Sequence, residues 1–137
     1  MNSVFVDTSG FFALYARNDA DHPQAVDLFR RASSERWQLV TTNAVVMETH
    51  ALLLNRARDG RTVALKFLDD LKSSGFRVER VTDADEAAAI ALIRAHVDKS
   101  YSLCDALSFV VCERSGIAQA ISCDDDFRSY GRLNVLL

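Results

Sequence analysis

The sequence predicts an α/β fold in which a mostly parallel sheet is flanked by helices. Short apolar runs rich in Val, Ile and Phe recur along the chain, and longer stretches with apolar residues at helical spacing separate them. Strands that are joined through helices pair in parallel. The 137 residues contain no internal repeat, low-complexity tract or linker, so we expect residues 1–137 to form a single domain.

Five strands and six helices are expected. The strands are 3–6, 38–42, 76–81, 118–123 and 133–136. The first helix is expected to be capped by Thr8 or Ser9 and to reach Tyr15. The other five are expected at 22–32, 44–57, 63–71, 84–97 and 103–115. Pro23 stands at the start of its helix, where its missing N–H does no harm. R-D-G-R at 58–61 is expected to be a turn.

The composition limits the class of protein. The 16 Lys and Arg against 19 Asp and Glu give a net charge of -3, which argues against coating nucleic acid by bulk charge but not against cutting it. Three cysteines without paired spacing suggest thiols in a reducing compartment. The start lacks a secretory pattern, and no apolar run approaches the ~20 residues that span a bilayer. We expect a soluble cytoplasmic protein without a membrane segment.

Four acidic residues are expected at one edge of the sheet. Asp7 ends the first strand and Asp124 ends the strand 118–123, while Glu48 and Asp105 lie near the starts of two helices. In an open parallel sheet the functional crevice lies at the carboxyl ends of the strands. Because the four acids belong to different elements, only the fold would bring them together.

Such a cluster suggests a particular chemistry. Four carboxylates in one crevice repel one another unless they take up protons or bind a cation. Oxygen ligands are preferred by Mg²⁺ and Mn²⁺, and two such ions held ~4 Å apart can clamp the attacking and leaving oxygens of a phosphoryl displacement. The sequence therefore suggests metal-dependent hydrolysis of a phosphodiester.

Each acid also has an ordinary structural explanation. A helical residue such as Glu48 is more often on the surface, and Asp105 suits a helix N-terminus for electrostatic reasons alone. In the run Asp124 to Asp126, we expect Asp125 to point to solvent. Asp124 is the expected ligand and Asp126 a supporting residue, since alternate residues of an extended segment share a side.

Other residues invite different hypotheses. His22, His50 and His96 share no metal-binding spacing, and Cys104 has no evident histidine to activate it, so we expect core or surface roles for them. R-A-R-D-G-R at 56–61 clusters three arginines that could follow an RNA backbone, although such clusters are usually solvated turns.

Four blocks together resemble the PIN domain family, in particular its VapC-type toxins. They are F-V-D-T-S at the start, V-V-M-E-T-H-A-L-L, S-L-C-D-A-L-S-F-V-V and I-S-C-D-D-D-F, and their order and spacing cover nearly the whole chain. The resemblance implies an α/β/α sandwich with a central mostly parallel sheet. It also implies a Mg²⁺- or Mn²⁺-dependent endoribonuclease whose acidic positions are Asp7, Glu48, Asp105 and Asp124. Thr8 and Ser9 match the hydroxyl pair after the first acid.

The resemblance implies partners as well. Toxins of this type pair as homodimers and are held silent by a cognate antitoxin, which typically inserts a segment with an Arg into the acidic crevice. Two other hypotheses remain. A phosphatase or phosphoacceptor enzyme would want a second Asp two residues after the first and a lysine at a strand end, and the chain has neither. A non-catalytic PIN-like RNA-binding or assembly module is the main alternative.

Overall fold

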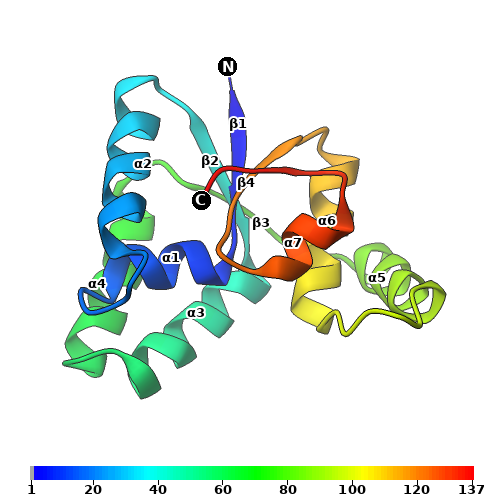
Figure 1. Ribbon diagram of the computed structural model, residues 1–137, viewed down its shortest axis with the longest axis horizontal. Coiled ribbons are helices and arrows are strands. Elements are labelled where there is room, and N and C mark those ends of the chain that lie inside the picture. Colours follow the sequence, from blue (N-terminus) through cyan, green and yellow to red (C-terminus); the bar gives the residue numbers. More distant parts are fainter. Residues whose placement is uncertain (1) are drawn as a thin grey trace.

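A five-stranded sheet runs through the centre of the structure, a computed structural model that describes residues 2–137 (Figure 1). Its strands are β1 (Ser3–Val6), β2 (Gln38–Thr42), β3 (Arg77–Glu79), β4 (Gln119–Ile121) and β5 (Asn134–Val135). They lie in the order β3-β2-β1-β4-β5, and all four neighbouring pairs are parallel. The predicted parallel sheet is confirmed.

Helices cover the sheet on two sides (Figure 1). The helices α1 (Thr8–Tyr15), α2 (His22–Ser34), α3 (Asn43–Arg56) and α4 (Gly60–Ser73) form one group, and α5 (Asp83–Ala95), α6 (Leu103–Arg114) and α7 (Asp125–Tyr130) form the other. The expected α/β/α layering and the six predicted helices are present. The short helix α7 was not predicted, because its six residues show little apolar periodicity.

The central strand β1 lies in the middle of the core. Val4, Phe5 and Val6 are fully buried, as expected for a parallel strand with helices on both faces. Phe11 packs edge-on against Phe67, with 5.0 Å between ring centroids, within the same core cluster. Burying such side chains stabilises each by roughly 1.5–3 kcal/mol relative to exposure. The end of β1 is therefore held rigidly.

Helix α1 begins directly against the end of β4. A Cβ built on Gly10 would lie 2.6 Å from the backbone oxygen of Ile121, closer than real Cβ atoms come. Only glycine permits this approach. The first turn of α1 and the segment after β4 are thus adjacent.

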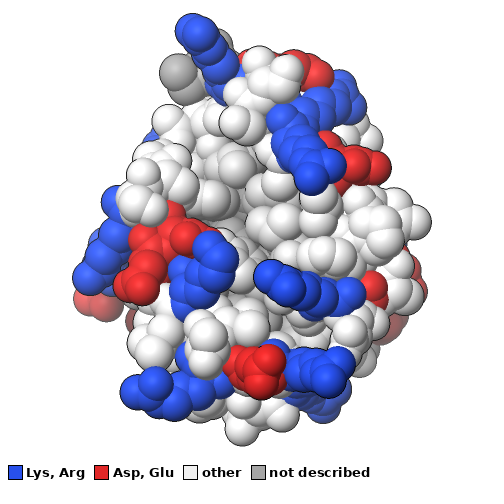
Figure 2. Space-filling view, turned by 90° about the vertical axis from the view of Figure 1, so that its left-hand side faces the viewer, with Lys and Arg blue, Asp and Glu red and all other residues white. Residues whose placement is uncertain are grey.

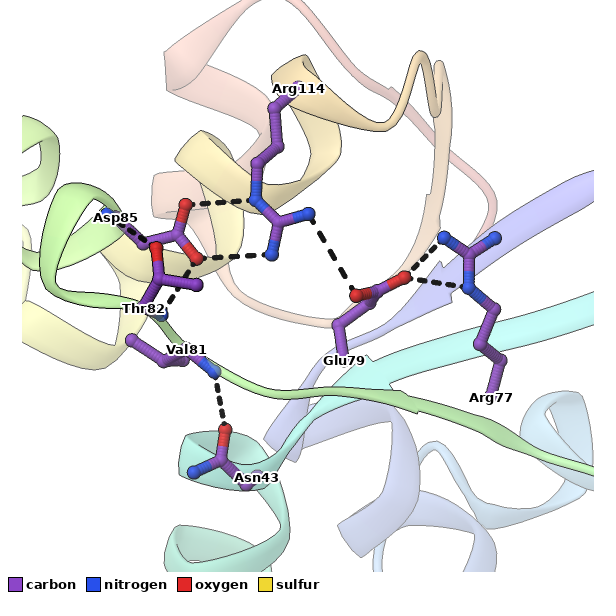
Figure 3. A network of polar contacts seen from close by, with 7 residues as sticks. All are labelled: Asn43, Arg77, Glu79, Val81, Thr82, Asp85 and Arg114. Carbon is purple, nitrogen blue, oxygen red and sulfur yellow. Dashed lines mark hydrogen bonds and ion pairs between the residues drawn. The ribbon is translucent and has the colours of Figure 1, made fainter.

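A polar network holds α6 to the edge of the sheet (Figure 3). The Arg114 guanidinium donates to both carboxylate oxygens of Asp85, at 2.8 Å from Nε and 3.0 Å from Nη2, and its other nitrogen lies 3.8 Å from Glu79. The Asn43 side-chain oxygen accepts from the Val81 N–H at 2.9 Å. These contacts fix the segment between β3 and α5 against α3 and α6.

Several predicted boundaries differ from the structure. The strands expected at 76–81, 118–123 and 133–136 are shorter, so Asp124 lies three residues beyond β4 instead of at its end. The turn predicted at 58–61 is cut short because α4 begins at Gly60. Within residues 2–137, no helix combines the length and apolarity that a bilayer crossing requires.

Candidate active site

The acids gather where the order of the strands reverses. From β1 the chain moves to β2 and β3 on one side of the sheet, and β4 returns to the other side of β1. A crevice opens at the carboxyl ends of strands at such a reversal. Asp7 follows β1 directly and occupies the N-cap position of α1. The prediction that Thr8 or Ser9 caps this helix was wrong, because both residues already lie within it.

Two serine hydroxyls hold the Asp7 carboxylate. Ser9 Oγ and Ser122 Oγ each lie 3.0 Å from Asp7 Oδ2 and donate to it. The same hydroxyls accept from the chain after β4: the Cys123 N–H donates to Ser9 at 2.8 Å, and the Asp124 N–H donates to Ser122 at 3.0 Å. Ser122 was missing from the predicted site residues. Its signal was a hydroxyl directly after a strand that neighbours β1.

Asp105 is positioned by a helix cap. Ser102 is the N-cap of α6, and its hydroxyl accepts from the Asp105 N–H at 3.0 Å. In return the Ser102 N–H donates to Asp105 Oδ2 at 3.2 Å. This reciprocal capping box fixes the Asp105 side chain at the start of the helix. The helix predicted at 103–115 is confirmed: α6 begins at Leu103, with Ser102 as its cap.

Asp105, Asp124 and Asp126 converge. Each offers a carboxylate oxygen, and these three oxygens lie within 4.8 Å of one another. Asp124 is the N-cap of α7, and its Oδ1 accepts from the Asp126 N–H at 2.9 Å. The N-cap hydrogen bond at the start of α7 therefore holds Asp124 and Asp126 close together. The reasoning from an extended segment was wrong, although it chose the same two residues. The Asp125 side chain is fully exposed, as predicted.

The carboxylates of the site have no close cationic partner among residues 2–137. Burial raises the pKa of Asp7 to about 7, although the hydrogen bond from Ser122 opposes this. Burial and then the charge of Asp124 raise the pKa of Asp105 to about 6, against the backbone hydrogen bond from Ser102. Burial likewise raises the pKa of Asp126. Among residues 2–137, the ion pairs within 4.0 Å all involve other acids.

These donors fit a hard divalent cation. All are carboxylate oxygens, the ligand type of Mg²⁺ and Mn²⁺, and the pKa values of Asp7 and Asp105 are raised chiefly by burial and further by neighbouring negative charge. The buried Oγ1 of Thr8, the residue after Asp7, has no hydrogen-bond partner among the described residues. Such an atom usually bonds to water or an ion.

Glu48 stands apart from the three converging acids. It lies in the second turn of α3, is exposed, and does not belong to the group within 4.8 Å. Burial, and then the charges of Glu48, Asp7 and Asp105, raise the pKa of the Cys104 thiol. Cys104 thus lies among three of the predicted acids. Its raised pKa agrees with the packing role expected for it, since a reactive thiol needs a lowered one.

Comparison with known proteins identifies the family. The PIN domain family model matches residues 4–133. The 23S rRNA-specific endonuclease VapC20 of Mycobacterium tuberculosis is 38% identical over 133 residues, covering 96% of this chain and 97% of the relative. The crystal structure of that VapC20, described as a sarcin–ricin-loop-cleaving toxin, superposes with a TM-score of 0.84 at 34% identity, covering 96% and 98% of the two chains.

A more distant structure shares the fold. VapBC2 from Rickettsia felis, solved bound to a DNA fragment of its promoter, has a TM-score of 0.69 at 9% identity, covering 98% of this chain and 97% of the other. With a family model matched over nearly its whole length and a close relative of the same architecture, this chain belongs to the PIN domain family, and within it to the VapC type.

Proposed function

We propose that this protein is a divalent-metal-dependent endoribonuclease that acts as the toxin of a toxin–antitoxin pair. The observation that supports this most is the convergence of Asp105, Asp124 and Asp126 beside the buried, uncompensated Asp7. A bound Mg²⁺ or Mn²⁺ would supply Lewis acidity and activate water for attack on phosphorus. Asp7, Asp105 and Asp124 would hold the ion, with Asp126 supporting them.

The remaining residues have distinct proposed roles. Ser9 and Ser122 orient Asp7 by donating to the same carboxylate oxygen, Oδ2. Thr8, with its unpartnered hydroxyl, would hold a water at the base of the crevice. Glu48, exposed on α3, would act at the rim, close to where substrate enters. We further propose that residues 1–137 form one domain.

The substrate is proposed from the relative. VapC20 is described as a 23S rRNA-specific endonuclease, and its crystal structure as that of a sarcin–ricin-loop-cleaving toxin. With 38% identity over 96% of the chain, we propose the same RNA hairpin as the substrate here. The proposed partners are a cognate antitoxin, whose Arg would pair with the acids, and a second copy in a homodimer. The proposed location is the cytoplasm, where thiols such as Cys104 stay reduced.

The decisive experiment is cleavage of a synthetic sarcin–ricin hairpin with Mg²⁺ or Mn²⁺, beside an EDTA control and an unrelated hairpin. We expect metal-dependent cutting that Asp7→Asn and Asp105→Asn abolish. Asp125→Asn is the matched control, because it removes an exposed charge from the same acidic run. Cutting that survives Asp7→Asn would mean a contaminating nuclease or a misplaced site.

A negative result has a defined meaning too. If the wild type cuts neither hairpin with either ion, a calorimetric titration with Mn²⁺ and an RNA-binding measurement follow. RNA binding without cleavage would favour the alternative function, a non-catalytic PIN-like RNA-binding or assembly module, over the enzyme.

A further inference from the structure

A cavity of about 820 Å³ lies at the far end of α1 from the acids. Leu14, Tyr15 and Val63 contribute apolar and aromatic surface. Arg17, Arg58 and Lys66 contribute positive charge, which outnumbers the negative charge of Asp59 and Asp70 in the same lining. The cations come from three places: the turn after α1, the turn between α3 and α4, and α4 itself. Figure 2 views the molecule from the side that carries α2 and α4, where Lys and Arg side chains flank a hollow in the surface.

Two of these cations are free for a ligand. Lys66 Nζ is engaged by Asp70 at 3.0 Å, and Asp70 also accepts from the Tyr15 hydroxyl at 2.6 Å. For Arg17 and Arg58, by contrast, the part of the chain that the structure describes contains no carboxylate within 4.0 Å. Two exposed guanidiniums on different elements can grip one anionic ligand from both sides.

The cavity is connected to the acid site through two helices. Asp7 caps the start of α1, and Leu14 and Tyr15 close its last turn; eight helical residues span about 12 Å. Helix α3 bears Glu48 near its start, and Arg58 follows its end. Both helices therefore run from the crevice toward the cavity. A polymer that enters the crevice would need to extend only about one α1 length to reach Arg17 and Arg58.

We propose that this cavity, with Arg17 and Arg58, is a second binding site for the RNA substrate, which takes phosphates flanking the cleaved bond. The proposal rests on the proposed ribonuclease function. A chain of net charge -3 with an acidic crevice repels RNA at the reacting site, so attraction must come from local cations elsewhere. Arg58, in the short connection between α3 and α4, supplies one of them.

The test compares two double variants of equal charge. Arg17→Gln with Arg58→Gln removes the proposed contacts, while Arg30→Gln with Arg94→Gln removes two exposed arginines on α2 and α5. Each changes the net charge from -3 to -5, that is -3 - 2. The substrates are a sarcin–ricin hairpin with a long stem and single-stranded flanks, and the same loop trimmed to its closing pairs. KM, kcat and the salt dependence of binding to an Asp7→Asn background are measured.

We expect the cavity variant to raise KM for the long RNA about tenfold over the control variant, since each exposed ion pair contributes modestly. Its kcat should change less than about twofold, and the trimmed loop should be cut normally. The salt slope of binding should fall by about 1.4, which is 2 × 0.7 for two phosphate contacts to single strands.

Three outcomes would overturn the proposal. One is a cavity variant that matches the control on the long RNA. Another is an equal loss of kcat on both RNAs, because that would indicate damage to the acid site. A third is normal RNA binding with loss of co-purification of a co-expressed antitoxin, which would make the cavity a peptide site. A wild type that cuts nothing would instead refute the proposed function, so the two failures are distinguishable.

Discussion

Removing the charge of Asp7 should stabilise the metal-free protein, and increasingly so as the pH rises. Asp7 is 3% exposed, and its pKa is raised from 3.8 to about 7, chiefly by burial. A carboxyl with a raised folded-state pKa favours folding in its protonated form. That contribution is complete below pH 3.8 and is lost as the pH rises through about 7. Asp7→Asn keeps the shape of the side chain and removes this penalty.

The size of the effect follows from the pKa shift. The difference between 3.8 and about 7, multiplied by 1.36 kcal/mol per unit, gives about 4 kcal/mol for the ionised state at pH 8. At pH 5 the folded carboxyl is still protonated while the unfolded one is ionised, and the penalty is below about 2 kcal/mol. The stability advantage of Asp7→Asn over the wild type should therefore grow by roughly 2–3 kcal/mol between pH 5 and pH 8.

The assay is urea unfolding of both proteins in EDTA at pH 5, 6, 7 and 8. Comparing the two chains at each pH cancels the titration of groups that do not interact with Asp7. Added Mn²⁺ should then stabilise the wild type far more than the variant, because a ligand of the folded state stabilises it by mass action. A stability difference that stays constant with pH would refute the reasoning, and so would equal stabilisation of both chains by Mn²⁺.

Three further substitutions, with Asp125→Asn as a control, test the framework of the site. Gly10→Ala should lower the free energy of unfolding by about 1–3 kcal/mol in urea titrations, since its Cβ would meet the Ile121 oxygen at 2.6 Å. Asp85→Asn should cost about 1–2 kcal/mol in the same titration, because it removes the paired charge from Arg114, whose partial exposure softens the loss. Asp124→Asn should preserve the melting temperature, since Asn also caps helices, and weaken Mn²⁺ binding in calorimetry, whereas the exposed Asp125→Asn should change neither. Equal Mn²⁺ affinity in the last two variants would exclude Asp124 as a ligand.

The layers of the fold could be predicted because local signals and tertiary packing agree. The apolar run of β1 is buried on both faces, and α6 begins at Leu103, where the sequence predicted a helix. The helix α7 was missed because it has six residues, two of them acidic, and little apolar periodicity. Its ends did carry signals: Asp124 as an N-cap and Gly131 with a φ of 79° after the last turn. Short capped helices escape prediction when periodicity is the main criterion.

The acids themselves were predictable, but their arrangement was not. Chain order placed Asp7 and Asp124 at the same sheet edge. It could not show that the Ser9 and Ser122 hydroxyls join the Asp7 carboxylate to the backbone N–H groups of Cys123 and Asp124. Nor could it show that Glu48 lies outside the converging group. The buried face of α3 is formed by Val45, Thr49 and Leu53. Glu48 lies beside this face, and it is exposed to solvent.

Two buried aspartates of this fold differ in whether a cation compensates their charge. Asp7 and Asp85 are each 3% exposed. The hydrogen bond from Arg114 lowers the pKa of Asp85, whereas desolvation raises that of Asp7, for which no cation lies within 4.0 Å among residues 2–137. A fold that compensates one buried charge with a two-pronged guanidinium could do so for another. Asp7 has no such partner and lies beside three converging carboxylates, an arrangement best explained by a cation that binds there. The stability cost of the buried Asp7 charge is then the free energy that such an ion would recover.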